Sequence, residues 1–292
     1  MFRSWKIGSA FGIDVYIHWL FVLLPAYLIL TSWRAGESWE FAALKLVMLV
    51  AVFTCVLLHE FGHALAARLF HIKTLDITIL PIGGLARLEH SSGKPIQELV
   101  IALAGPAVNL VISFLLFFPW ALLSQFELPQ QPNLLGPNFL FFLMAGNVVL
   151  VIFNLIPAYP MDGGRAVRAI LSIWLPFETA TILAGRLGQI IAGFFAILGV
   201  LFFAHAWSLL LIAGFVLLAA SYDIRIAQLR QAYSEQYPDA FARAHAGLAF
   251  VPTLNPETSS SSQIGKIGGE TTVNRPNLAD QAADPKRTDF DK

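Results

Sequence analysis

Long apolar segments separated by short polar ones dominate the chain. Six of them approach the roughly 20 residues that a helix needs to cross a bilayer, at residues 15–33, 41–70, 96–120, 139–156, 180–203 and 206–222. Only helices and closed barrels satisfy their backbone in lipid, and these segments lack strand alternation and are too long for barrel strands. The pattern predicts an all-α polytopic membrane protein, a bundle of six transmembrane helices.

A different pattern lies between the second and third segments. Residues 74–79 alternate polar and apolar side chains, Gly83 and Gly84 form a turn pair, and residues 85–88 can return beside the first run. We expect a short β-hairpin or loop at the membrane surface. A plain cytosolic loop is the simpler alternative. As a hairpin, its edge could pair with an unwound substrate backbone, which makes Gly83 and Gly84 candidate substrate-binding residues.

The C-terminal part of the chain is polar. Residues 224–251 begin with a charged stretch that could form a surface helix, and residues 252–292 are rich in Ser, Thr, Gly, Asn and Asp. We therefore expect a six-span domain over residues 1–223, a cytosolic helical extension over 224–251 and a disordered tail over 252–292.

Composition agrees with a membrane protein and narrows the chemistry. The chain is 57% hydrophobic and 13% charged, with zero net charge, and its mean hydropathy is +0.66. Nothing in it is basic enough for nucleic-acid binding. The single cysteine, Cys55, excludes an internal disulfide and a cysteine-based zinc site. Cys55 lies four residues before His59, but we interpret it as a small core residue of a membrane helix rather than as a metal ligand.

The distribution of Lys and Arg predicts the orientation of the six segments. When the segments alternate direction, most basic residues fall on one face, and the loop at residues 121–138 on the other face has none. By the positive-inside rule the basic face is cytosolic. We therefore expect a multi-pass protein of the cell membrane with both termini in the cytoplasm.

The second segment contains the motif HExxH, at His59 to His63. Residues four apart lie about 40° apart around a helix, so both imidazoles can face one zinc ion. Glu60 has the place of a general base, because a metal lowers the pKa of a bound water and a carboxylate can take its proton. Ionisable groups at bilayer depth are functional candidates by default. The motif predicts one Zn²⁺ per chain, held in part by His59 and His63.

A catalytic zinc needs a third protein ligand, and Asp162 is the best candidate. It follows the fourth segment, at the cytosolic side of the membrane, where His59 is also expected to lie. Pro157 and Pro160 interrupt a regular helix there, and Gly163-Gly164 permits a turn that aims the carboxylate into the bundle. The alternative is that Asp162 caps the helix that begins near Gly164; the two roles are compatible.

Two asparagines in the apolar segments are further candidates. Asn154 lies eight residues before Asp162, where its amide could steady an oxyanion or cap the backbone at Pro157. Asn109 follows the small residues at 105–107, and an interhelical hydrogen bond is favoured for it, with substrate contact as the alternative.

Three ordered motifs resemble the site-2 protease family of intramembrane zinc metalloproteases: HExxH, GPxxN at residues 105–109, and NxxP followed by DGG at residues 154–164. The six-span layout without a PDZ insertion is similar to the compact branch that includes the sporulation-factor-processing proteases. The resemblance covers about residues 11–220. It implies His59, His63 and Asp162 as zinc ligands, Glu60 as general base and Asn154 as a substrate or oxyanion contact.

The C-terminal segment departs from the family pattern. Many compact members carry a pair of CBS modules after the last span, and the polar segment found here differs from them. The resemblance therefore gives no support for nucleotide-linked regulation through such modules.

The sequence thus predicts a zinc metalloendopeptidase that cleaves a transmembrane segment of another protein near the cytosolic face, as in regulated intramembrane proteolysis. Its partners would be the lipid bilayer and a substrate with a single transmembrane helix. Two alternatives remain. A metal transporter should show more acidic or histidine ligands along a path across the bilayer, and a non-catalytic zinc-binding scaffold would tolerate loss of Glu60.

Overall fold

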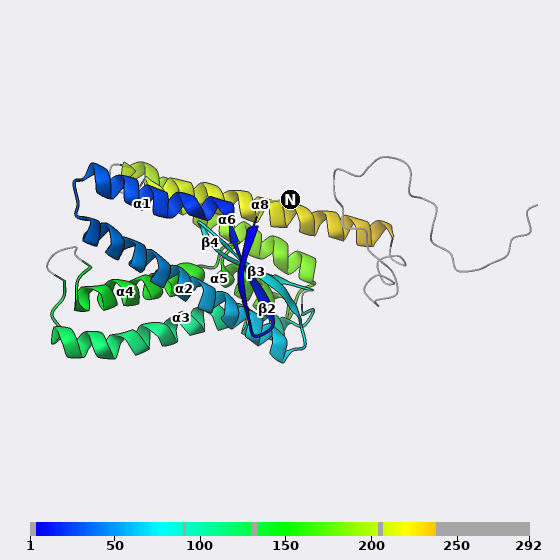
Figure 1. The fold of residues 1–292 in the computed structure, drawn as a ribbon. Coiled ribbons are helices and arrows are strands. Elements are labelled where there is room, and N and C mark those ends of the chain that lie inside the picture. The colour runs from blue at the N-terminus through cyan, green and yellow to red at the C-terminus, as the bar shows by residue number, and fades with distance from the viewer. Residues whose placement is uncertain (1–3, 90–91, 130–133, 204–206, 238–292) are drawn as a thin grey trace, which may run out of the picture. The chain divides into compact units, whose positions relative to one another are not determined.

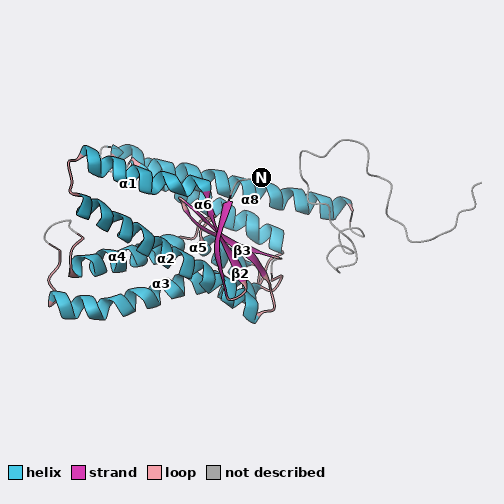
Figure 2. Cartoon of the chain, viewed as in Figure 1, coloured by secondary structure: helices cyan, strands magenta, loops and turns pink. Residues whose placement is uncertain are grey.

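A helical bundle with a small β-sheet makes up the described part of the chain (Figures 1 and 2). The computed structural model describes residues 4–89, 92–129, 134–203 and 207–237, which belong to one compact unit. The helices are η1 (Trp19–Val22), α1 (Leu23–Arg34), α2 (Trp39–Leu69), α3 (Pro95–Ser124), α4 (Pro137–Asn154), α5 (Asp162–Leu171), α6 (Phe177–Leu201) and α8 (Ser208–Gln236). 

Five of the described helices are long and apolar enough to cross a membrane: α2, α3, α4, α6 and α8. The sixth expected span, at residues 15–33, is only partly helical. Its first residues form a strand that ends at His18, and the apolar helix that follows, Trp19–Arg34, is shorter than the others. Ile13 and Val15 are buried in a core with the sheet and α2, so these apolar side chains serve the sheet rather than lipid.

The sheet has four strands: β1 (Ser4–Ala10), β2 (Ile13–His18), β3 (Thr74–Leu80) and β4 (Gly83–Leu88). Their order is β1-β2-β3-β4. Strands β1 and β2 are antiparallel, β2 and β3 parallel, and β3 and β4 antiparallel. The hairpin expected between the second and third segments is present as β3 and β4. Its turn is Pro81-Ile82, so Gly83 and Gly84 are not the expected turn pair but the first residues of β4. The N-terminal hairpin of β1 and β2 was not predicted. The prediction of an all-α protein was therefore incomplete, because the helical bundle also carries a four-stranded sheet.

One face of the sheet packs on the C-terminal half of α2. Ile77 and Ile79 of β3 join the buried residues of β2 against Phe61, which lies between the two HExxH histidines, and Ala64, which follows them. An ion pair between Asp76 and Arg87 also links β3 to β4. Because burial of such apolar side chains is the main favourable contribution to folding, this core fixes the sheet to the helix that carries the motif.

Helix α3 lies close to α2 and packs against α4 and α5 as well. At Gly62 an added Cβ would lie 2.8 Å from the carbonyl oxygen of Ala104, so the two backbones approach more closely than a side chain would allow. Helices α6 and α8 pack along each other. Helix α8 passes residue 223 without a break and ends at Gln236. The remainder of the expected extension, and the tail at 252–292, lie outside the described residues.

Candidate metal centre

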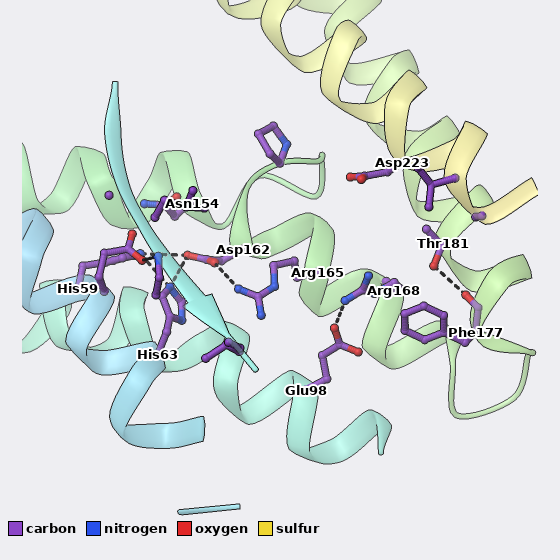
Figure 3. A pocket seen from close by; sticks show the side chains of 18 of the residues that line it. His59, His63, Glu98, Asn154, Asp162, Arg165, Arg168, Phe177, Thr181 and Asp223 are labelled. Carbon is purple, nitrogen blue, oxygen red and sulfur yellow. Dashed lines mark hydrogen bonds and ion pairs between the residues drawn. The ribbon is translucent and has the colours of Figure 1, made fainter. Parts of the chain in front are cut away.

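The structure brings His59, His63 and Asp162 together (Figure 3). The two Nε2 atoms lie 3.1 Å apart, and each lies 3.1 Å from Oδ2 of Asp162. All three residues are buried, with exposed fractions of 6%, 4% and 7%. Within the part of the chain that the structure describes, this is the group of His, Cys and acidic residues that could hold a metal ion. Cys55 is buried elsewhere in α2.

Neighbouring residues determine which nitrogen of each imidazole carries the proton. Nδ1 of His63 lies 2.7 Å from the carbonyl oxygen of Ile101, which can only accept, so this Nδ1 is the N–H donor. Nδ1 of His59 lies 2.5 Å from Oδ1 of Asn109. The Nε2 atom of a neutral imidazole is then left as an acceptor on both rings.

Asn109 is held in the orientation that this arrangement requires. Its amide Nδ2 donates to Oδ1 of Asn147 at 2.7 Å, and Asn147 in turn donates to the carbonyl oxygen of Leu143. The Asn109 Oδ1 atom therefore faces His59 as an acceptor. Asn109 is fully buried and joins α3 to α2 and α4, and it is not itself among the residues that line the cavity described below.

Three acceptor atoms without a proton between them therefore face a common point: two imidazole Nε2 atoms and one carboxylate oxygen. Such an arrangement repels itself unless a cation occupies that point. Two nitrogens and one oxygen are a donor set that zinc takes in catalytic sites, where a fourth position stays open. The residues present therefore fit a zinc ion.

The backbone before α5 places Asp162. An added Cβ at Gly163 would meet the backbone of Leu155 and Ile156, and at Gly164 that of Ala158 and Tyr159, so α5 begins pressed against the segment before it. The N-cap is Met161, without a side-chain cap bond. The Asp162 carboxylate reaches the imidazoles instead of capping α5, and its second oxygen, Oδ1, lies 3.8 Å from Nη1 of Arg165.

Glu60 lies where α2 and β4 meet. Its Oε2 atom accepts a hydrogen bond from the backbone N–H of Ala86 at 3.0 Å. At Gly84 an added Cβ would lie 2.8 Å from Oε1 of Glu60, so only glycine lets the strand approach this closely. The strand thereby fixes the Glu60 carboxylate beside the metal-binding group.

A cavity of about 550 Å³ adjoins these residues. His59, His63, Asp162 and Glu60 line one part of it, together with Gly84, Ala86 and Asn154. The rest extends between α5, α6 and α8 and is lined by charged residues that include Arg165, Arg168 and Asp223 (Figure 3). Gly83 is not among the lining residues.

Sequence reasoning missed the residues that orient this group. The carbonyl of Ile101 carries no sequence signal at all. In the sequence, Glu98 is simply an acidic residue near the start of an apolar segment, and Arg168 is one of several basic residues. In the structure the two form a buried ion pair. The GPxxN motif offers a partial signal for Glu98. Because Glu98 and Asn109 of this motif lie about three helical turns apart, the two share one face of α3.

Comparisons with known proteins agree on one family. Residues 47–135 match the sequence profile of Peptidase family M50. A zinc metalloprotease of Methanocaldococcus jannaschii is 32% identical over 227 residues, 77% of this chain and 62% of the relative. A putative zinc metalloprotease of Synechocystis is 32% identical over 77% of this chain and 61% of the relative. The chain thus spans about three fifths of the length of these curated relatives.

Two further matches extend the comparison. Stage IV sporulation protein FB of Bacillus subtilis is 31% identical over 148 residues, about half of each chain. Among solved structures, the site-2 protease from Methanocaldococcus jannaschii matches with a TM-score of 0.55 and 31% identity, covering 76% of this chain and 95% of that one. With the family profile, the curated relatives and this structural match in agreement, the chain belongs to peptidase family M50, the site-2 proteases.

Proposed function

We propose that this protein is a zinc-dependent intramembrane endopeptidase that cleaves a transmembrane segment of another protein near the cytosolic face. The observation that carries the proposal is the convergence of His59, His63 and Asp162 beside Glu60, on a cavity bordered by a strand edge. The curated relatives named zinc metalloproteases support the same metal. 

Each residue of the site has a separate role in the proposed peptide hydrolysis. His59, His63 and Asp162 would hold the zinc ion. Bound zinc supplies a Lewis acid that polarises a peptide carbonyl and makes water more acidic. Glu60 takes a proton from the attacking water and returns one to the departing amine, since a carboxylate held by a single N–H keeps lone pairs free for both transfers. Asn154, which lines the cavity, would donate to the developing oxyanion.

Strand β4 would hold the substrate extended. It is a terminal strand of the sheet, with β3 as its strand neighbour. Ala86 directs its N–H away from β3 toward Glu60, and alternate residues of a strand point their backbone groups to the same edge, so Gly84 and Leu88 share that outer edge. All three line the cavity. A substrate helix that unwinds could therefore form backbone hydrogen bonds beside the general base.

The proposed setting is the cell membrane, with both termini and the sheet on the cytosolic side. The five long apolar helices support a multi-pass protein. The sheet carries Lys6 and Arg87 and α5 carries Arg165 and Arg168, which supports placing these elements on the cytosolic face. The substrate would be a protein with a single transmembrane helix.

The test is the variant Glu60→Gln, purified and reconstituted with a single-span substrate. The amide keeps the shape of the side chain but cannot take a proton, so we expect cleavage to fall about 100- to 10,000-fold. Zinc content, measured by metal analysis, should stay at one per chain. Cleavage at the original rate with zinc bound would refute the mechanism. In Asp162→Ala, unchanged zinc affinity would refute the ligand set.

A further inference from the structure

One stripe of α3 contacts both histidines of the metal-binding group and the helix that supplies its third member. Glu98, Ile101, Gly105 and Asn109 follow one another at spacings of three and four residues, so they share a face of the helix. Ile101 and Asn109 hold the two imidazoles. At Gly105 an added Cβ would meet Nε2 of both rings. The stripe acts as a template for the histidines, and Glu98 lies at its N-terminal end.

Glu98 binds the helix that supplies the third member of the group. It forms an ion pair with Arg168 of α5 (Figure 3). The side chains are only 8% and 14% exposed. The Arg168 guanidinium also lies over the rings of Phe177, at 4.7 Å, and Tyr159, at 5.6 Å. Arg168 is thus held from three sides.

Helices α3 and α5 meet at two points, and the distance between these points is nearly the same along both helices. Along α3, Gly105 at the imidazoles and Glu98 at the ion pair are seven residues, or about 10 Å, apart. Along α5, Asp162 and Arg168 are six residues, or about 9 Å, apart. The helices run in opposite directions here, so a single register satisfies both contacts. A shift of α5 by one residue, about 1.5 Å, would break the ion pair and move the carboxylate away from the imidazoles.

Stability alone is a poor explanation for this pair. Burial lowers the pKa of Arg168 to about 10, a sign of the cost of removing the charge from water. Its Nε atom is buried without a hydrogen-bond partner among the described residues. Apolar side chains of similar volume commonly replace buried ion pairs without loss of stability, so a role in fixing one arrangement is the stronger explanation.

We propose that Glu98 and Arg168 are positioning residues that set the register of α5 along α3 and so hold the Asp162 carboxylate at the imidazoles. This inference rests on the proposed metal site. It predicts that the ion pair controls metal affinity although neither residue touches the metal.

The experiment compares four variants of the purified full-length protein: Arg168→Met, Glu98→Gln, the exchange Glu98→Arg with Arg168→Glu, and Lys45→Met. The last removes the Lys45–Glu37 ion pair, which lies near the other end of α2 and serves as the matched control. Zinc affinity is measured by competition with a chelator. The visible spectrum of bound Co²⁺ reports coordination geometry, and thermal unfolding reports stability.

We expect zinc affinity to fall about 10- to 100-fold in the two single variants, as for other residues that orient ligands. The Co²⁺ spectrum should change with it, and the exchange variant should recover most of the affinity. Lys45→Met should bind zinc as the wild type does. If the single variants do not fold, the exchange variant alone tests the inference. A folded exchange variant whose zinc affinity stays well below that of the wild type would overturn it.

Two other outcomes separate this inference from the proposed function. A folded Arg168→Met with wild-type zinc affinity and an unchanged Co²⁺ spectrum would overturn the positioning role and leave the metal site intact. A wild-type protein that binds no zinc would overturn both.

Discussion

At the scale of single residues, the centre depends on side chains and backbone atoms that never face the cavity. The Ile101 carbonyl and Asn109 fix the imidazole protons on Nδ1, and the missing side chain of Gly105 leaves space where the two Nε2 atoms meet. Loss of an orienting partner typically lowers metal affinity about 10- to 100-fold. Gly105 therefore contributes to the site through the space that it leaves for the imidazoles.

Gly105→Ala should weaken zinc binding at least 10-fold, because the new Cβ would lie 2.7 Å from His59 Nε2 and closer still to His63 Nε2. Chelator competition measures the effect. Gly146→Ala is the control, since an added Cβ at this position of α4 has nothing within 4 Å. Equal zinc affinity in both variants would show that the imidazoles do not occupy the space beside Gly105.

At the scale of elements, β4 contributes to the site through its backbone. It fixes Glu60 with one N–H and leaves further groups of the same edge toward the cavity. The side chains of the strand can vary in such an arrangement, but its distance from α2 cannot. Gly84 sets that distance.

Gly84→Ala should reduce cleavage roughly 100-fold, because displacing a catalytic group by about 1 Å commonly has this effect. Zinc binding should remain, since Glu60 is not a ligand. Rates with a reconstituted single-span substrate and metal analysis measure both quantities. The control is Gly8→Ala on β1, where an added Cβ contacts nothing within 4 Å. Loss of zinc together with activity would contradict this division of roles.

Local patterns predicted much of this arrangement. Helical spacing placed His59 beside His63, and a broken helix end pointed to Asp162, which the structure brings within 3.1 Å of both. The alternation of residues 74–79 located β3. The N-terminal hairpin offered only one sequence signal, Gly12. In the structure Phe11 and Gly12 form its two-residue turn, and both have positive φ.

Long-range partners could not be predicted in the same way. The parallel pairing of β2 with β3 joins positions such as Asp14 and Asp76 that no periodicity connects. The Glu98–Arg168 pair depends on how α3 and α5 are rotated toward each other. The length of the first apolar segment was misleading because its first residues pack on the sheet, and burial in protein and burial in lipid select similar side chains.

At the scale of the molecule, the four strands lie in one sheet, so both hairpins belong to the same end of the bundle. The turn between α1 and α2, around Gly36, is separated from the sheet by these two helices (Figure 1). If the sheet is cytosolic, the turn at Gly36 must face the opposite side.

Cysteine labelling tests this topology. In a Cys55→Ala background, Ile82→Cys, in the exposed turn between β3 and β4, should react with a membrane-impermeant maleimide only from the cytosolic side. Gly36→Cys should react only from the other side. Labelling of both positions from one side would refute the proposed crossing of α1 and α2.

The parallel pairing of β2 with β3 also constrains biogenesis. The ribosome makes β2 before α1 and α2 and makes β3 after them. The N-terminal hairpin must therefore wait, with one edge unpaired, until the helix that carries the HExxH motif is in place and the next hairpin emerges. Only then can β4 reach Glu60, and Asp162 is translated later still. The metal-binding group thus cannot be complete before α5 has been translated and has packed against α3.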